Sequence, residues 1–219
     1  YSDVITWAQS MNIEADSDYM LFGCYDCSKK NLKCRLSLSE VEAVVTSQCE
    51  SGAYVDKLFT EASNKRLDEN QPICSVCSAS ICISNQGNVY PCEGWQGYSV
   101  GSILESSLLD IWRSSERVLM LRKLKLGDFP QCVSCDYIRY CSPCLYRNAN
   151  ENSGDFHKVS PYFCKVAELQ KRVVEQEICK RNNCFHVCTE EGSTFEGKTV
   201  ILAVGVKHIQ APAGVGKHE

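Results

Sequence analysis

Eight cysteines in the middle of the chain stand at spacings typical of metal-binding loops. They are Cys74, Cys77, Cys92, Cys132, Cys135, Cys141, Cys144 and Cys164. Three pairs among them have two intervening residues, and such a short turn lets two thiolates converge on one ion or on one edge of a cluster. Three such pairs within about ninety residues form a specific pattern. The sequence therefore predicts two metal sites, each with four thiolate ligands.

The bulk composition is that of an ordinary globular protein. The chain has 219 residues, of which 44% are hydrophobic and 23% are charged, so it is long enough for one or two domains with a hydrophobic core. Its net charge of −4 gives no electrostatic reason to expect nucleic acid. No apolar run approaches the eighteen or so residues of a membrane span. We expect neither nucleic acid nor membrane among the partners.

The cysteine content sets this chain apart. Sixteen cysteines would indicate disulfides in a small secreted protein. No export signal is visible, however, and many of the cysteines are too close in sequence for disulfides between them to cross-link a core. This pattern favours metal ligands, and it favours a reducing cytoplasm as the compartment. The chain starts at Tyr1 rather than Met, which suggests that an N-terminal portion is missing.

Hydrophobic periodicity predicts the elements before the cysteine-rich region. Residues 2–11 have a helical pattern, residues 13–22 fit a strand, and a second helix is expected from a capping box formed by Ser39 and Glu42. This helix–strand–loop–helix order fits the closing units of an α/β barrel. Residues 51–71 are polar and are expected to form a linker with one short helix.

The cysteine-rich region should be held by a hairpin and several helices. Asn85 to Asn88, with Gly87 at the tip, separate two short apolar runs and predict a β-hairpin that delivers Cys92. Helices are expected from Ser106 or Ser107, with Ser107 and Asp110 near the cap, and over 115–125 and 166–179, with a loop-rich stretch over 132–164. Residues 200–206 fit one buried strand.

Several of these features together resemble the SPASM domain, a C-terminal extension of many radical S-adenosylmethionine (SAM) enzymes that modify peptides. The resemblance runs from Cys74 to about Lys171. The residues that carry it are Cys77-x9-Gly87-x4-Cys92, Asn88-Val-Tyr-Pro-Cys92, Gly101-x-Ile103-x4-Leu108-x2-Ile111-Trp112, Cys132-x2-Cys135-x5-Cys141, Gly154-Asp155 and Cys164.

The resemblance implies two auxiliary [4Fe–4S] clusters whose ligands are interleaved along the chain. The first cluster would take Cys74, Cys77, Cys92 and Cys144, and the second would take Cys132, Cys135, Cys141 and Cys164. In such enzymes the clusters pass electrons from the substrate or towards the SAM cluster, or organise a surface for the peptide. The implied partners are a peptide or protein substrate and an electron donor protein.

Two departures from the family pattern bear on these expectations. The family usually has three residues between the positions of Cys141 and Cys144, and this chain has two, which makes Cys144 the least certain ligand. Cys82 is an alternative ligand or a buried structural thiol. The Cys-x3-Cys-x2-Cys motif that binds the SAM cluster is absent from the sequence. The chain is therefore either a truncated radical SAM enzyme, with SAM bound only if the missing half is present, or a degenerate member that only binds.

The expected fold class is α+β. A small loop-rich iron–sulfur domain with a β-hairpin and helices (71–178) would follow the last α/β units of a partial (β/α) barrel and a linker (1–70), and the tail (179–219) is unassigned.

The first functional hypothesis is the C-terminal portion of a radical SAM/SPASM enzyme that acts in the maturation of ribosomal peptides, with no catalytic residue identified. The alternative is a non-catalytic peptide-binding module stabilised by zinc or a cluster, because four-cysteine zinc sites use the same turns. Two smaller groups are candidates for further metal sites or for free thiols. They are Cys24, Cys27 and Cys34, and the tail set Cys179, Cys184, His186 and Cys188.

Overall fold

The chain is an α+β protein in which short strands and loops are held between helices. The computed structural model describes residues 2–13, 18–50, 52–181, 185–188, 194–197 and 208–210. The expected strand over 200–206 lies outside these residues. Eight α-helices are present in the described part of the chain: α1 (Ser2–Ser10), α2 (Leu38–Cys49), α3 (Gly52–Asn64), α4 (Leu108–Ser114), α5 (Glu116–Lys123), α6 (Pro130–Val133), α7 (Leu145–Glu151) and α8 (Pro161–Arg181).

Two small antiparallel sheets accompany these helices. The first consists of β1 (Cys82–Ile83), β2 (Asn88–Tyr90) and β3 (Gly101–Ser102), in the order β1-β2-β3. The second consists of β4 (Phe185–Cys188), β5 (Thr194–Gly197) and β6 (His208–Gln210), in the order β5-β4-β6. Short 3₁₀ turns lie at Lys30–Cys34, Leu126–Asp128 and Ile138–Tyr140.

The predicted hairpin is confirmed. Cys82 pairs with Tyr90 and Ile83 pairs with Val89 across the Gly87 turn. Gly87 has φ +81°, the left-handed region that glycine enters without the steric penalty of a Cβ atom. The third strand was not predicted: Gly101 pairs with Val89. Val89 is fully buried, so the middle strand anchors this sheet in the core.

Helix α2 begins two residues earlier than predicted. Its N-cap is Ser37, whose hydroxyl accepts a hydrogen bond from the Glu40 amide at 3.3 Å. In return, the Glu40 carboxylate accepts from the Ser37 amide at 2.8 Å, which completes a capping box. The expected cap at Ser39 and Glu42 is wrong, since the capping box that forms lies two residues upstream, at Ser37 and Glu40. The cap of α4 at Ser107 is confirmed, because its hydroxyl accepts from the Asp110 amide at 3.1 Å.

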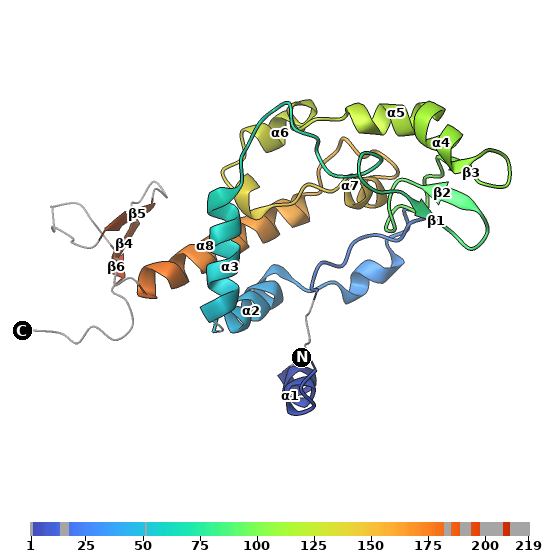
Figure 1. Cartoon of the computed structure of the whole chain (residues 1–219). Coiled ribbons are helices and arrows are strands. Elements are labelled where there is room, and N and C mark those ends of the chain that lie inside the picture. The colour runs from blue at the N-terminus through green and yellow to red at the C-terminus, as the bar shows by residue number, and fades with distance from the viewer. Residues whose placement is uncertain are drawn as a thin grey trace, which may run out of the picture.

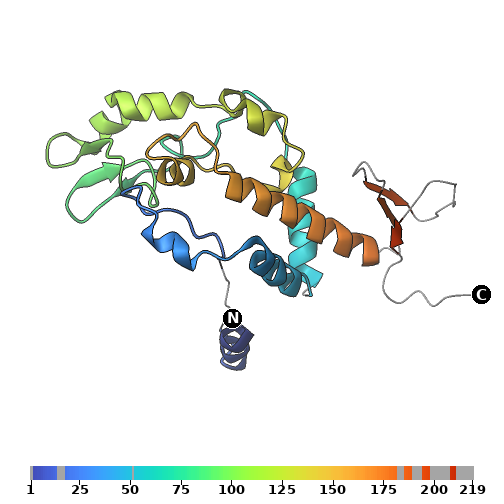
Figure 2. The same cartoon turned by 180° about the vertical axis from the view of Figure 1, so that it is seen from behind.

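The stretch expected to be a linker is largely helical. Helix α3 has 13 residues and packs with α2 against the long helix α8, which crosses α3 in Figures 1 and 2. Val55 on α3 and Val174 on α8 are fully buried in this shared core. The exposed residues of α3 include Asp56, Lys57 and Glu61, so the short helix expected in this stretch is present and is amphipathic.

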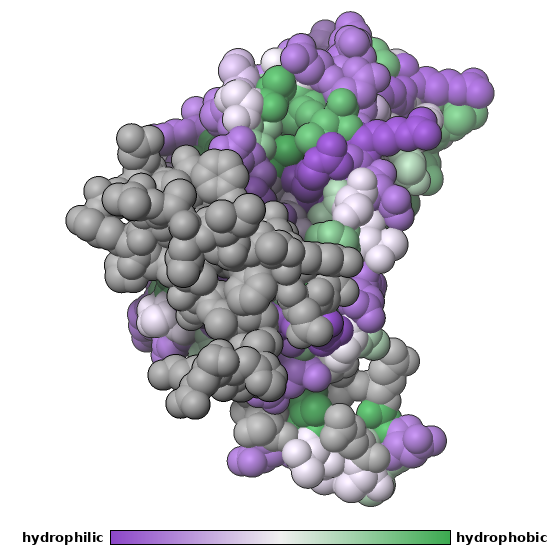
Figure 3. Space-filling model, turned by 90° about the vertical axis from the view of Figure 1, so that its left-hand side faces the viewer, coloured by the Kyte–Doolittle hydropathy of each residue, from purple (hydrophilic) through white to green (hydrophobic). Residues whose placement is uncertain are grey.

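A second core lies under the cysteine loops. It contains Val89, Trp95, Phe129 and Leu145 and is flanked by α4 and α5. In the view of Figure 3, hydrophilic side chains cover most of the described surface, and one hydrophobic patch interrupts them near the top. None of the described helices is long and apolar enough to cross a membrane.

The described residues before Gln71 contain helices and loops but no strand. Residues 13 and 18–22, the described part of the expected strand over 13–22, have no strand pairing. The α/β units of a partial barrel are therefore not seen in this part of the chain. Residues 19–36 instead run along the helical core, where the Tyr162 hydroxyl donates to the Leu36 carbonyl at 2.9 Å.

Candidate metal centre

Cys74 and Cys77 lie in a loop that is pinned to the region after α5. The Ile73 amide donates to the Leu124 carbonyl at 3.3 Å, and an antiparallel bridge joins Pro72 to Lys125. Cys77 has φ +55°, and this left-handed residue turns the backbone so that both cysteines belong to one tight loop. The loop geometry is what a Cys-x2-Cys pair needs to present two sulfurs together.

Cys92 and Cys144 come from two other elements. Cys92 follows strand β2, and its carbonyl accepts from the Trp95 amide at 3.2 Å. Cys144 is the N-cap residue of α7, and its carbonyl accepts from the Asn148 amide at 3.1 Å. Both cysteines are half-buried.

The first predicted set shares one electrostatic neighbourhood. Burial raises the pKa of Cys92 to about 11, and the charges of Cys144 and Cys74 contribute to the rise. Burial also raises the pKa of Cys74, with a contribution from Cys144. The pKa of Cys77 is raised to about 11 by burial, with a smaller contribution from Cys74. The charges of Cys74 and Cys144 thus act on Cys92, and the charge of Cys74 acts on Cys77.

The second predicted set also comes from separate elements. Cys132 lies in α6 and Cys135 just after it, where the Cys135 Sγ accepts from the Tyr137 amide at 3.4 Å. Cys141 follows the 3₁₀ turn that ends at Tyr140. Cys164 lies in the first turn of α8. The expectation that α8 begins at residue 166 was therefore wrong, and the long helix itself positions this cysteine.

These four thiols line one cavity of about 80 Å³. Its apolar wall includes Ile138, Val159 and Phe163, and Cys144 borders it as well. Burial raises the pKa of Cys132 to about 11, with contributions from Cys141, Cys164 and Cys135. Four thiols around an apolar cavity fit the ordinary ligation of an iron–sulfur cluster, which is held by four cysteine thiolates.

Zinc and an iron–sulfur cluster require different distances between the four sulfurs. Among the described residues, no three Cys, His, Asp or Glu side chains are gathered closely enough to hold a metal ion. One tetrahedral zinc with Zn–S bonds of about 2.3 Å requires sulfurs about 3.8 Å apart. In a [4Fe–4S] cluster each thiolate binds a different iron, so the ligands stand further apart.

The other cysteines form no comparable group in the described part of the chain. The cysteines from Cys24 to Cys179 are all free thiols. Cys34 is exposed, and the Cys27 thiol lies 3.6 Å from the Ala149 carbonyl. Cys82 lies on β1, where its backbone pairs with Tyr90. Cys184 lies outside the described residues, as do the side chains of His186 and Cys188, so the expected tail set has no structural outcome.

Sequence reasoning missed the charged residues around the second set. Lys65 donates to the carbonyl oxygens of Ile138, at 3.0 Å, and of Cys141. Arg147 borders the cavity of the four thiols. Neither residue carried a signal in the sequence, because α3 and the cysteine loops meet only in the folded chain.

Comparison with known protein families identifies the central segment. Residues 74–144 match the family model SPASM, described as an iron-sulfur cluster-binding domain. This segment is a SPASM domain. The match covers less than half of the chain, and it contains all the predicted ligands except Cys164. No curated protein and no solved structure gave a significant match to the chain.

The SPASM segment therefore supplies iron–sulfur binding, and its loops contain the cysteines that this chemistry requires. The thiols with raised pKa are protonated near neutral pH when no metal is bound. Binding a cluster must displace those protons, because the ligand is the thiolate.

Proposed function

We propose that the chain holds two [4Fe–4S] clusters and serves as an electron-transfer module. The first cluster would be held by Cys74, Cys77, Cys92 and Cys144, and the second by Cys132, Cys135, Cys141 and Cys164. The observation that supports this proposal is the cavity lined by Cys132, Cys135, Cys141 and Cys164, which Cys144 also borders.

Complete cysteine ligation favours electron transfer over direct binding of a substrate to iron. Each cluster supplies a centre that accepts and donates one electron at a time. With four thiolates each, neither cluster has an open iron position for another ligand. The protein contributes the thiolates, the apolar wall of Ile138, Val159 and Phe163 that keeps water away, and a loop framework tied to α8 and to the hairpin.

We further propose that the module belongs to a radical SAM enzyme that modifies a peptide or protein. The SPASM match supports this role, because such domains accompany that enzyme class in the resemblance described above. The sequence given contains no Cys-x3-Cys-x2-Cys motif, so the SAM cluster and the barrel that holds it would come from a further segment or a partner chain. An electron donor protein and a peptide substrate are the proposed partners, and the cytoplasm is the proposed compartment.

Serine substitutions test the ligand sets. Cys144→Ser should lower the iron content of the anaerobically reconstituted chain by at least one cluster, about four irons. The loss should exceed one cluster if the interleaved loops order each other. Cys82→Ser is the matched control, since Cys82 is half-buried in the same sheet that delivers Cys92, and its iron content should equal that of the wild type. Iron loss in the Cys82 variant, with none in the Cys144 variant, would show that Cys82 and not Cys144 is the fourth ligand of the first cluster.

The second candidate is a zinc-stabilised binding module without a redox function. The repeated Cys-x2-Cys turns are the observation that favours it. Under this reading the purified chain would contain zinc and be colourless, and its metal would not respond to reductant.

A further inference from the structure

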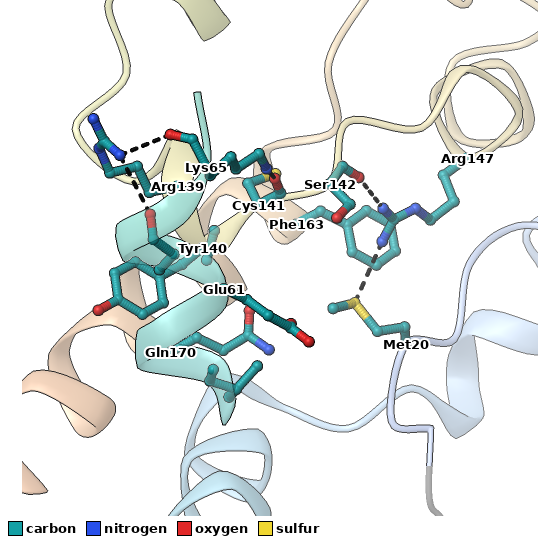
Figure 4. A pocket seen from close by; sticks show the side chains of 13 residues that line it. Met20, Glu61, Lys65, Arg139, Tyr140, Cys141, Ser142, Arg147, Phe163 and Gln170 are labelled. Atoms are coloured by element: carbon teal, nitrogen blue, oxygen red, sulfur yellow. Dashed lines mark hydrogen bonds between the residues drawn. The ribbon is translucent and has the colours of Figure 1, made fainter. Parts of the chain in front are cut away.

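A second cavity lies directly beside the four-thiol cavity of the proposed second cluster. It has a volume of about 370 Å³ and lies between α3, α8 and the loop of residues 139–142. Cys141, Ser142, Arg147, Phe163 and Ala167 line both cavities, so the two share a wall. Figure 4 shows this cavity with Lys65 reaching towards Cys141 and Arg147 standing over Phe163.

Lys65 is a half-buried cation whose hydrogen bonds go to the cluster loop. Its Nζ donates to the Ile138 carbonyl at 3.0 Å and to the Cys141 carbonyl. Burial lowers the pKa of Lys65, and the neighbouring charge of Cys141 partly offsets this. Within the described part of the chain Lys65 forms no ion pair. Its Nζ is instead held against the backbone of Cys141, a ligand of the proposed second cluster.

Arg147 is a second partly buried cation near Cys141, on the side away from Lys65 in Figure 4. Its guanidinium donates to the Ser142 carbonyl and to the Met20 Sδ, at 3.3 Å for the latter. Its Cζ stands 4.6 Å from the centroid of the Phe163 ring. These partners are all neutral, and no carboxylate pairs with Arg147 among the described residues.

Partly buried cations usually have an anionic partner, because removing a charge from water is costly. Arg35 follows this rule: its guanidinium is paired with Glu151. Lys65 and Arg147 have no such partner among the described carboxylates. The thiolates of the proposed second cluster would supply the missing negative charge. A cluster with four thiolate ligands carries negative charge, and each added electron increases that charge.

We propose that Lys65 and Arg147 are the counter-charges of the second cluster and raise its reduction potential. This inference rests on the proposed function and deepens it. A nearby positive charge stabilises the reduced, more negative form of a cluster more than the oxidised form. Because both cations border the same cysteine, removing either one should make the second cluster harder to reduce.

The first cluster has a different cation. The Arg122 Nε donates to the Cys77 carbonyl at 2.9 Å, and its guanidinium lies 4.6 Å from the centroid of the Trp112 ring. Arg122 would therefore be the counter-charge of the first cluster, as Lys65 and Arg147 are of the second. This pairing allows each of the two measured potentials to be assigned to a site.

The experiment is an anaerobic redox titration of the reconstituted chain, followed by electron paramagnetic resonance. Lys65→Met and Arg147→Met should each lower the same one of the two potentials. Arg122→Met should lower the other one. Lys65→Arg and Arg147→Lys should keep the wild-type value, because they keep the charge and a hydrogen-bond donor.

Removing a negative charge from the same cavity separates electrostatics from packing. Glu61 lines the cavity and is exposed, so Glu61→Gln should raise the potential that Lys65→Met lowers, by a smaller amount because water screens it. Arg139→Met is the comparison. Arg139 lines the cavity too but is exposed, and its guanidinium donates to the carbonyls of Ala62, Ser63 and Lys65 at the end of α3. Because water screens its charge, its loss should lower the same potential by less than the loss of Lys65 does.

Two results would overturn the inference. In an iron-loaded chain, equal potentials in the wild type and in both the Lys65→Met and Arg147→Met variants would overturn it and leave the proposed function intact. A chain that incorporates no iron would overturn the proposed function and this inference together. Iron and sulfide analysis before each titration tells these outcomes apart.

Discussion

At the scale of single residues, one buried ion pair ties the N-terminal segment to the cysteine-rich region. The side chains of Arg35 and Glu151 are 12% and 9% exposed. The Arg35 Nε also donates to the Leu21 carbonyl at 2.7 Å, and its guanidinium lies 4.3 Å from the centroid of the Tyr162 ring. Ser160 donates its hydroxyl hydrogen to Glu151 at 2.9 Å. The pair therefore joins residues 21–36 to α7 and to the start of α8.

Arg35→Met should destabilise the chain strongly. It leaves the Glu151 carboxylate buried without its cation, which costs about 3 kcal/mol or more of unfolding free energy. Urea denaturation monitored by circular dichroism measures this loss.

Arg172→Met is the matched control for that variant. Its ion pair with Glu42 is about half exposed, at 47% and 42%, so its loss should cost less than about 1 kcal/mol. Equal losses in the two variants would contradict the structural role given to the buried pair.

At the scale of elements, the hairpin that delivers Cys92 depends on Gly87. A Cβ atom at this position would lie 2.9 Å from the Leu104 Cγ and 3.3 Å from the Ile103 Cγ1. The left-handed φ of Gly87 adds a conformational cost for any other residue. The tip of the hairpin is thus fixed both by its backbone and by its neighbours.

Gly87→Ala should lower the unfolding free energy by about 2 kcal/mol, of which about 1 kcal/mol is the backbone cost. Gly154→Ala is the control: Gly154 has φ +95°, but a Cβ atom there would meet nothing within 4 Å. Thermal unfolding should therefore give a smaller loss for the Gly154 variant. A larger loss at Gly154 would show that the contact with Leu104 and Ile103 does not matter.

The elements also show how far the sequence could predict the fold. The Gly87 hairpin and the Ser107 cap were predictable because their signals are local. The start of α2 was placed two residues late because Ser37 and Ser39 both stand three residues before a glutamate. The start of α8 at Pro161 was missed although proline is favoured in a first turn.

The sequence predicted a short helix within 51–71 but not the cations of the second site. Val55, Leu58 and Phe59 of α3 pack in the core shared with α8, at a helical spacing that the sequence already contains. Lys65 and Arg147 meet at Cys141 through contacts between residues far apart in the sequence. By contrast, the cysteine spacing pointed to the SPASM segment without any structure. The two ligand sets stay predictions, since Cys144 of the first set also borders the cavity of the second.

At the scale of the whole molecule, metal and folding should be coupled. The cysteine loops are held together by short turns and by the core around Val89 and Leu145, with little regular structure of their own. Without metal, the thiols of Cys77, Cys92 and Cys132 are kept protonated by burial, which raises the pKa of each from 9.0 to about 11.

The metal-free chain should therefore lose stability at alkaline pH. Between about pH 9 and pH 11 the unfolded chain has released these protons while the folded chain still holds them, so the unfolding free energy falls as the pH rises. Urea midpoints of the metal-free protein at about pH 8 and about pH 10.5 measure the change. Replacing the three cysteines with alanine should flatten this dependence, and an equally steep fall in that variant would contradict the assignment.

The most direct test of the central claim is the metal content of the anaerobically purified chain. Two [4Fe–4S] clusters predict about eight irons and eight sulfides per chain, with a broad absorption band near roughly 400 nm that bleaches on reduction. One or two zinc ions per chain, with no iron and no colour, would contradict the electron-transfer account and leave a zinc-stabilised binding module.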